Sequence, residues 1–220
     1  MELMPIANDK ILKAVQSLKQ AEGSQRKFAQ SVDLSVNIQN VDLKKPENRI
    51  REVVNLPHAP KGKSIKICVI ADGDMGVKAK QAGADLVLGR ADVERLTGDK
   101  KAAKKLASGY DFFLARVDLM PVFGKALGQT LAPKGKMADP VPPTADIATI
   151  ITRYKKSVRV RIRDQPLIHC RIGTEAMEDK ELTDNIAAVL STIEGKFKTS
   201  KALRSVYVKK TMGAPIKVEL

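Results

Sequence analysis

The clearest hydrophobic pattern in the chain is an alternation of apolar and polar residues that begins at Phe28 and ends at Ile38. The apolar side chains of Phe28, Val32, Leu34, Val36 and Ile38 take even-numbered positions, and polar residues lie largely between them. Because successive side chains of a β-strand point to opposite faces, this spacing predicts one long strand with a buried face and a polar face.

Further elements are predicted on either side of this strand. Apolar residues recur at helical spacing near residue 11 and again near residues 147 and 182. Alternating apolar residues return after residue 157. We expect helices over residues 11–18, 147–154 and 182–193, and strands over residues 158–162, 167–172, 206–208 and 216–218.

The middle of the chain follows a different pattern, in which strands alternate with helices. Residues Ile65–Ala71 form a continuous apolar run, as expected of a strand that is buried on both faces. The expected strands are Ile65–Ala71, Asp85–Leu88 and Asp111–Val117, and the expected helices are Met75–Gln81, a lysine-rich Val93–Leu106, and Met120–Leu131. Strands that alternate with helices predict a parallel, Rossmann-like sheet.

Two proline-rich segments, Leu56–Ser64 and Met137–Pro143, bracket this middle part and predict linkers. Two such crossings indicate an inserted domain, with the residues before and after it assembled into one lobe. The predicted fold is therefore α/β with two domains. A discontinuous α+β lobe takes residues 1–60 and 153–220, and a Rossmann-like three-layer domain takes residues 64–150.

The net charge of the chain indicates what kind of partner it binds. The 220 residues include 39 Lys and Arg against 25 Asp and Glu, so the formal charge is +14. Residues 1–64 carry +4, residues 65–151 carry +3 and residues 152–220 carry +7. An excess of this size attracts polyanions, and most of it lies in the outer lobe.

Several other classes of protein are disfavoured by composition. No apolar run approaches the ~18 residues of a membrane span, and the start MELMPIANDK lacks the layout of a signal peptide. We therefore expect a soluble, cytoplasmic protein. Trp is absent and aromatic residues make up only 4%, which argues against a surface that stacks many single-stranded bases. Cys68 and Cys170 are isolated and form no metal signature, so we expect neither metal nor cofactor.

An arginine-rich strand offers a first candidate contact with phosphates. If Val158, Val160 and Ile162 face a core, the residues between them, Arg159, Arg161 and Arg163, share the opposite face, followed by Asp164. Guanidinium groups bind phosphate oxygens in pairs. The alternative is a solvated sheet face that pairs with acidic residues of a helix, and the sequence leaves both interpretations open.

Phe28 and His169 each have a structural and a functional interpretation. Phe28 follows Lys27 at the start of the long strand, where it either ends the core or stacks on a ribose or base, with Ser31 near a 2′-hydroxyl. His169 lies in an apolar strand segment and is either a structural residue whose polar groups are satisfied or a ligand contact. The only other histidine, His58, lies in a linker, so the sequence gives no case for catalysis.

The middle domain contains two loops of possible chemical interest. The turn at residues 73–76 follows a strand but lacks the G-x-G-x-x-G and G-K-[ST] patterns, and Asp72 and Asp74 would repel phosphate. A nucleotide-using enzyme built on this domain is therefore the weaker alternative function. The basic loop at residues 133–137 suits phosphate better, although it is equally consistent with a solvated loop.

The most unusual string is Thr211-Met212-Gly213 between the last two expected strands. One interpretation is a simple bend, with Gly213 supplying a positive φ and Met212 filling a gap. The other is a close-approach site, where Gly213 admits an RNA backbone, the Thr211 hydroxyl binds ribose and Met212 packs on a sugar. The sequence alone leaves these equal.

Three strings in this order around a Rossmann-like insertion resemble a known family: RKFAQSVDLSVNI, LIHCRIG and LRSVYVKKTMGA. The chain resembles the ribosomal protein "L-one" family of the large-subunit lateral stalk, in its archaeal form, over nearly the whole length. One departure concerns the middle domain, where Ala132 and Ala138 stand at positions that the family usually fills with glycine and proline.

The resemblance implies a non-enzymatic protein whose partners are large-subunit rRNA, exit-site tRNA and its own mRNA, whose translation it represses. It implies that the outer lobe binds the rRNA and that the protein aids release of tRNA. A monomer is expected outside the ribosome. The expected RNA-binding residues are Lys27, Phe28, Ser31, Arg163, Asp164, His169, Ser205, Thr211, Met212 and Gly213.

Overall fold

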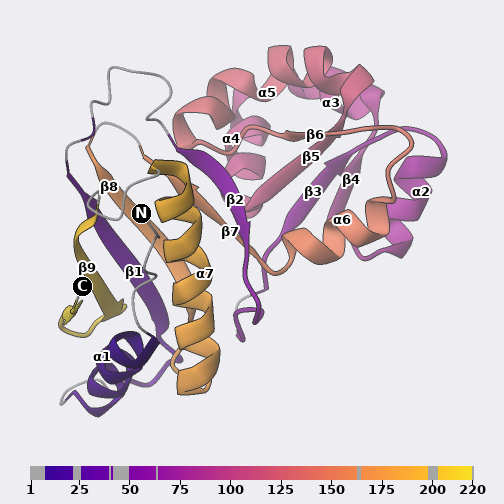
Figure 1. Cartoon of the computed structure of the whole chain (residues 1–220). Helices are drawn as coiled ribbons and strands as arrows, with labels where there is room; N and C mark the ends of the chain where they lie inside the picture. The colour runs from indigo at the N-terminus through magenta and orange to yellow at the C-terminus, as the bar shows by residue number, and fades with distance from the viewer. Residues whose placement is uncertain are drawn as a thin grey trace. The chain divides into compact units, whose positions relative to one another are not determined.

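A computed structural model gives the structure of the chain, and backbone contacts divide it into two compact units (Figure 1). The terminal unit consists of Met1–Lys63 and Lys156–Leu220, and the middle unit consists of Ser64–Lys155. The structure describes residues 8–21, 26–39, 41, 50–62, 64–162, 165–197 and 203–219. The predicted mixed α/β class with a Rossmann-like insertion is confirmed.

The main sheet of the terminal unit has four antiparallel strands in the order β10-β9-β1-β8. Its central strand β1 (Ser31–Ile38) comes from the first part of the chain. It lies between β8 (Leu167–Thr174) and β9 (Leu203–Lys210), and β10 (Ile216–Val218) forms one edge. Both ends of the chain are therefore needed to build this sheet.

Two helices pack against one face of this sheet, α1 (Asn8–Gln20) and α7 (Asp179–Phe197). Burial along β1 alternates strictly, so its even-numbered apolar residues join one core with both helices. The main contributors are Ile11, Val15 and Leu18 of α1, Val32, Leu34, Val36 and Ile38 of β1, and Leu182, Ile186, Val189, Leu190 and Ile193 of α7. Each such side chain contributes about 1.5–3 kcal/mol when it is fully buried.

A second, two-stranded sheet pairs β2 (Arg51–Asn55) with β7 (Ser157–Arg161). The sequence did not predict β2. The Glu52 side chain of this strand forms an ion pair with Lys196 of α7, with 3.4 Å between the carboxylate oxygen and Nζ. The small sheet therefore extends the terminal unit along the same helix.

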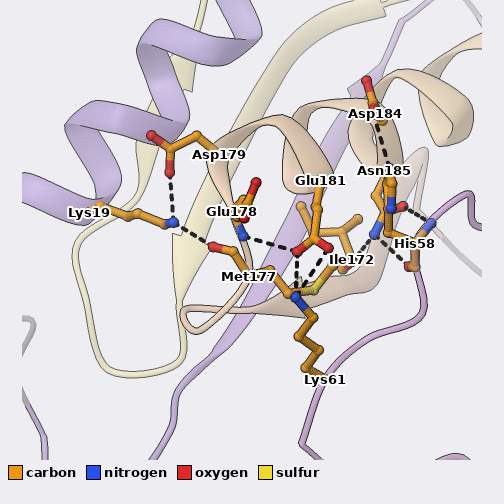
Figure 2. Close-up of polar contacts among 10 residues, drawn as sticks. All are labelled: Lys19, His58, Lys61, Ile172, Met177, Glu178, Asp179, Glu181, Asp184 and Asn185. Atoms are coloured by element: carbon orange, nitrogen blue, oxygen red, sulfur yellow. Dashed lines mark hydrogen bonds and ion pairs between the residues drawn. The ribbon is translucent and has the colours of Figure 1, made fainter.

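The segment that follows β2 is held to α7 by polar contacts (Figure 2). Asn185 is fully buried, and its amide nitrogen donates to the carbonyl oxygens of His58 and Ile172, each at 2.9 Å. The His58 N–H donates in return to Asn185 Oδ1 at 3.0 Å. Lys61 Nζ lies 2.9 Å from Glu181 Oε2. Paired buried polar groups of this kind fix the path of the backbone between the two units.

The middle unit contains a parallel sheet in the order β4-β3-β5-β6. Its strands are β3 (Ile67–Ile70), β4 (Leu86–Leu88), β5 (Phe112–Arg116) and β6 (Asp139–Val141). All four residues of β3 are buried. This continuous burial is what the unbroken apolar run in the sequence predicted.

Helices cover both faces of this parallel sheet. On one face α2 (Asp74–Gln81) packs against α6 (Ile147–Tyr154). On the other lie α3 (Arg90–Leu96), α4 (Lys100–Gly109) and α5 (Met120–Lys134), which share a core with β3 and β5. A short 3-10 turn, η2 (Val117–Leu119), leads into α5.

One predicted helix proved to be two. The lysine-rich segment Val93–Leu106 was expected to be continuous, but α3 ends at Leu96 and α4 starts at Lys100. The Asp99 carboxylate accepts hydrogen bonds from the N–H groups of Lys101 and Ala102, so it starts a new helix. A capping carboxylate at this position is favoured over a continuous helix because it satisfies otherwise unpaired donors.

The second proline-rich segment, Met137–Pro143, is not a simple linker, because residues 139–141 form the edge strand β6. Pro140 is tolerated there since an edge strand leaves one row of backbone groups unpaired. The compact middle unit continues to Lys155, beyond the expected residue 150, because α6 packs on α2.

Candidate nucleic-acid interface

The face of the terminal sheet opposite its helices carries a polar surface, which we call the open face. Strand pairing places Asp33 beside Arg171 and Lys209, and Ser35 beside His169 and Tyr207. These side chains are half-buried or exposed, in contrast to the even-numbered residues of β1. The open face comprises Asp33, Ser35, Asn37, His169, Arg171, Ser205, Tyr207 and Lys209.

The charges of the open face follow one row across three strands. Asp33 on β1 lies between Arg171 on β8 and Lys209 on β9, so the row carries an excess of positive charge. Burial raises the pKa of the Asp33 carboxyl above its ordinary value, although Arg171, Lys209 and His169 act in the opposite direction. The two cations therefore have one acidic neighbour in the row, and a guanidinium and an ammonium group are suited to phosphate oxygens.

A shallow cavity of about 620 Å³ lies over this face. Its lining includes the aromatic ring of Tyr207, the His169 imidazole and Pro215, together with the charged row. A planar base or a ribose can pack against such rings while its phosphates meet the cations.

The turn between β9 and β10 is held against the start of β1. The Thr211 N–H donates to Ser31 O at 3.1 Å, and the Ser31 N–H donates to Thr211 Oγ1 at 3.2 Å. The Met212 N–H donates to Oε1 of Gln30 at 3.0 Å. Gln30 is fully buried and also pairs with Glu175. The Gln30 N–H donates to the Glu175 carboxylate, and the Glu175 N–H donates to the Gln30 carbonyl oxygen. These contacts join segments that are 145 to 182 residues apart in the sequence.

Two large apolar side chains are exposed at this end of the sheet. Phe28 is 53% exposed and Met212 is 59% exposed. Phe28 precedes Gln30 by two residues, and Met212 is bonded to Gln30, so both lie at the same end of β1. Exposed apolar groups that are placed together beside polar ones are typical of a binding surface. This exposure does not agree with a phenylalanine in the core or with a methionine that fills a gap in the packing.

Gly213 is suited to its position because it lacks a side chain, and not because it adopts a positive φ. The expected positive φ is wrong, since positive φ values in the described glycines occur at Gly62, Gly73, Gly83 and Gly135. A Cβ at Gly213 would lie 3.2 Å from Cβ of Lys210, which is tighter than ordinary packing. A side chain at this position would therefore press on the strand that carries the turn.

The remaining predicted residues differ in exposure, and Ser205 is buried. Lys27 is exposed beside Phe28, and His169 is exposed on the open face. Ser205 lies at the far end of β9, where its hydroxyl accepts a hydrogen bond from Asn37 Nδ2 at 2.7 Å. Arg163 and Asp164 lie outside the described residues.

The arginine strand belongs to a different surface. Arg159 and Arg161 lie on β7 of the small sheet, with Arg51 of β2 paired to Arg161. Both β7 arginines are only half-exposed, and neither is without a partner in the structure. The basic loop of the middle unit is likewise engaged internally. Lys136 Nζ donates to the carbonyl oxygen of Tyr110 at 2.6 Å, and Pro133 lies inside α5.

Several residues of the surface were missed by sequence reasoning, among them Asp33, Arg171, Tyr207 and Lys209. The signal was available, because these residues alternate with buried ones in strands that the apolar pattern identified. Gln30 left no signal, since its burial depends on Glu175 and Met212, which are distant in sequence.

The two cysteines, the helices and the acidic residues are the candidates for thiol, membrane and metal sites. Burial raises the pKa of the Cys68 and Cys170 thiols to about 12, so both remain protonated and unreactive at neutral pH. Across the described ranges, every helix is too short or too polar to traverse a lipid bilayer. Within the same ranges His, Cys, Asp and Glu side chains form no cluster suited to a metal ion.

Comparison with known proteins gives matches over both units. A model of the ribosomal protein L1p/L10e family matches residues 18–214. Large ribosomal subunit protein uL1 of Thermofilum pendens is 46% identical over 213 residues, which cover 97% of this chain and 94% of that protein. The uL1 proteins of Hyperthermus butylicus and Archaeoglobus fulgidus are 50% and 44% identical, covering 89% and 98% of this chain and 89% and 100% of their own lengths. The chain therefore belongs to the ribosomal protein L1p/L10e family and is of the archaeal type.

Proposed function

We propose that this protein is a component of the large ribosomal subunit in the cytoplasm and that it binds folded rRNA of the lateral stalk. Family membership and the printed names of its relatives support the ribosomal role. The terminal unit is the proposed RNA-binding lobe, and its contact surface consists of the open face and the adjoining turn at Thr211–Gly213.

The observation that carries the proposal is the placement of Phe28 and Met212. Both side chains are more than half exposed, and they lie at the end of the polar sheet face where Thr211 contacts Ser31. An apolar surface of this kind packs on ribose or an unstacked base, and the hydroxyl of Thr211 can bind a 2′-hydroxyl. Shape and sugar contacts suit a helix–loop target rather than an extended single strand.

The charged row supplies the electrostatic part of binding. Arg171 and Lys209 flank Asp33 on the open face, and Lys27 is exposed next to Phe28. Each phosphate that these cations neutralise releases condensed counterions, so the affinity for RNA falls steeply with salt concentration. Replacing Arg171 and Lys209 together by Gln is expected to reduce the slope of log K against log salt by about 2.

The main test measures the affinity of full-length variants for a stalk rRNA fragment by fluorescence anisotropy. Met212→Ala and Thr211→Val are each expected to weaken binding by about tenfold, which corresponds to the ~1–3 kcal/mol of a good stacking or hydrogen-bonding contact. The thermal midpoint of unfolding should change little in Met212→Ala, because that side chain is exposed. It should fall slightly in Thr211→Val, because the Thr211 hydroxyl also accepts a hydrogen bond from the Ser31 N–H and donates one to Ser31 O.

Matched controls are available in the middle unit. Val77 is 56% exposed, so Val77→Ala removes a comparable apolar surface. Thr152 is exposed and its hydroxyl donates to Ala148 O at 2.9 Å, so Thr152→Val matches Thr211→Val. If the turn variants bind the fragment as tightly as these controls, the proposed contact surface is wrong. Competition with bulk tRNA tests whether binding is specific for the stalk fold.

We extend the proposal to two activities that the family resemblance implies: release of tRNA from the exit site and repression of the protein's own mRNA. Recognition by shape and sugar contacts supports the second, because an mRNA that adopts the same fold presents the same groups. The free protein is proposed to act as a monomer. A leader mRNA that displaces stalk rRNA from the wild-type protein, and that loses as much affinity as stalk rRNA does in Met212→Ala, would support repression. A leader that does not compete would refute it.

A further inference from the structure

The helix α4 of the middle unit presents four exposed lysines on one side. Lys100, Lys101, Lys104 and Lys105 are all exposed, whereas Ala103 and Ala107 face the core that α4 shares with α5. Residues four apart on a helix lie on one face and about 6 Å apart along its axis. The four ammonium groups therefore form one compact stripe, which we call the α4 lysine stripe.

The ammonium groups of these four lysines form no hydrogen bond or ion pair within the part of the chain that the structure describes. Their nearest acid along the chain, Asp99, uses its carboxylate to cap the helix. Other cations of the middle unit differ in this respect. Arg90 pairs with Glu94 at 2.9 Å.

Neighbouring groups strengthen the positive field of the stripe. Lys134 Nζ donates to Ser108 Oγ at 2.9 Å, which brings a fifth positive charge to the end of α4. Lys136 Nζ donates to the carbonyl oxygen of Ala107 at 3.1 Å and so masks the negative end of the helix. The first turn of α4 contains no acidic residue, and Lys100 and Lys101 lie at its positive end.

This arrangement works against the stability of the helix. Lys100 and Lys104, and likewise Lys101 and Lys105, are like-charged pairs four residues apart, each of which destabilises an isolated helix by about 0.2–0.5 kcal/mol. Cations in the first turn also oppose the helix dipole. A bound polyanion would offset these unfavourable terms, because each ammonium group gains an attraction to its phosphates.

The geometry points to a second RNA-binding surface on the middle unit, in which the α4 lysine stripe contacts the phosphates of a duplex independently of its sequence. This inference rests on the proposed ribosomal function for the identity of the polyanion. Lysine is a compact charge without the planar donor pair of arginine, and the stripe has no aromatic side chain, so it can hold a backbone but cannot read bases. The open face would specify the target, and the stripe would bind flanking RNA.

The test compares two full-length variants with equal net charge. The stripe variant carries Lys100→Gln, Lys101→Gln, Lys104→Gln and Lys105→Gln. The control variant carries Lys66→Gln, Lys78→Gln, Lys80→Gln and Lys155→Gln, which are exposed lysines of the same unit. Glutamine and lysine have similar helix propensity, so both variants should fold. The stripe variant should unfold at the same temperature as wild type or at a higher one.

Affinity is measured against salt concentration for two RNAs, a trimmed helix–loop fragment of the stalk and the same fragment with a long flanking duplex. With the long RNA, the stripe variant should lose about 3.6 from the slope of log K against log salt, as expected for four phosphate contacts on a duplex. The trimmed RNA should bind both variants alike. Protection of the four lysines from acetylation in the presence of the long RNA gives an independent readout without substitution.

Equal losses in the two variants would assign the effect to net charge and overturn the inference, as would an unchanged slope. If the stripe variant binds RNA as wild type does but no longer binds a polyglutamate peptide, the inference is overturned in favour of an acidic protein partner. The outcome is separable from the proposed function. If Met212→Ala leaves affinity unchanged but the stripe variant lowers the slope, the stripe binds RNA and the open-face proposal fails alone.

Discussion

The two units of this protein each contain a four-stranded sheet, but they differ in how many faces are buried. In the middle unit, neighbouring residues of β5 pack onto opposite helix layers. The Phe112 ring meets Tyr154 of α6 with centroids 5.2 Å apart, and the Phe113 ring meets Phe123 of α5 at 6.2 Å. In the terminal unit, β1 buries every second residue and exposes the row between.

The comparison teaches where each unit can bind. A parallel sheet with helices on both faces has no free face, so the contact surfaces of the middle unit have to be built from its helices and loops. The antiparallel sheet keeps one face polar and accessible, and its strands arrange cations, rings and hydroxyl groups in rows. The proposed rRNA surface and the proposed lysine stripe follow this division.

The largest expected effect comes from placing a carboxylate on either face of each sheet. Val36 of β1 and both Cys68 and Val69 of β3 are buried, whereas Ser35 is on the open face. Val36→Asp, Cys68→Asp and Val69→Asp should each lower the free energy of unfolding by about 4 kcal/mol or more, because a buried charge lacks a partner. Urea unfolding followed by circular dichroism measures this.

Ser35→Asp supplies the contrast, since it should fold normally and lose affinity for stalk rRNA through repulsion of phosphate. Equal destabilisation by Ser35→Asp and Val36→Asp would mean that the open face is covered in solution. A tolerated Cys68→Asp would show that the middle sheet also has a free face.

An intermediate effect is expected from Gln30→Ala. Gln30 is fully buried and accepts the Met212 N–H, so its loss leaves polar groups of Met212 and Glu175 unpaired. We expect a loss of about 1–3 kcal/mol in the free energy of unfolding. We also expect weaker rRNA binding and faster hydrogen exchange at the Met212 amide.

Asn185→Ala is the control for Gln30→Ala, because Asn185 is an equally buried polar residue of the same unit and contacts His58 and Ile172 rather than the turn. It should cost similar stability while the affinity for rRNA stays at the wild-type value. If both variants lose affinity in proportion to their lost stability, Gln30 has no specific positioning role.

The smallest effect concerns the pH dependence of Asp33. Its pKa in the folded protein is raised above the ordinary 3.8, mainly by burial, so the folded state holds this proton more tightly than the unfolded chain. The free energy of unfolding of the wild type therefore decreases as pH rises from about 3.8 through the raised pKa. Asp33→Asn has no carboxyl at this position, so its free energy of unfolding should not show this decrease.

At neutral pH Asp33→Asn should be more stable than wild type, and the difference should vanish below the ordinary pKa. The variant should bind rRNA about twofold more tightly, because one negative charge leaves the open face. Thermal unfolding at several pH values, together with anisotropy titrations, checks both expectations. A variant that is less stable at pH 7 would contradict the assigned cause of the pKa shift.

Much of the fold was predictable from local pattern. The alternation in β1 and the apolar run of β3 follow directly from side-chain burial, and both strands were found with small errors at their ends. The break between α3 and α4 was missed because the capping role of Asp99 competes with helical periodicity, which alone favours continuity. Strand β2 was missed because its two apolar residues, Val53 and Val54, are adjacent and do not alternate with polar ones.

The candidate site was predictable only in part. Phe28, Thr211 and Met212 were candidates from the residues alone, but the chain's own pattern left their burial undecided and the family resemblance favoured the RNA contact. Tyr207 and Lys209 followed from alternation once β9 was placed beside β1, which requires the strand order. Strand order depends on contacts between residues that are far apart in sequence, and local spacing carries no information about them.

The amino-acid sequence by itself determined which residues are apolar, where they alternate, and that the chain carries a large positive charge, because these properties belong to single residues and their neighbours. Only the tertiary structure decided that Ser31 meets Thr211 and that Gln30 holds Met212, with Phe28 exposed at the same end of the sheet. It also decided that the ammonium groups of four lysines of α4 have no partner among the described residues. Such juxtapositions arise when distant segments share one core, and burial of that core fixes which polar groups remain at the surface.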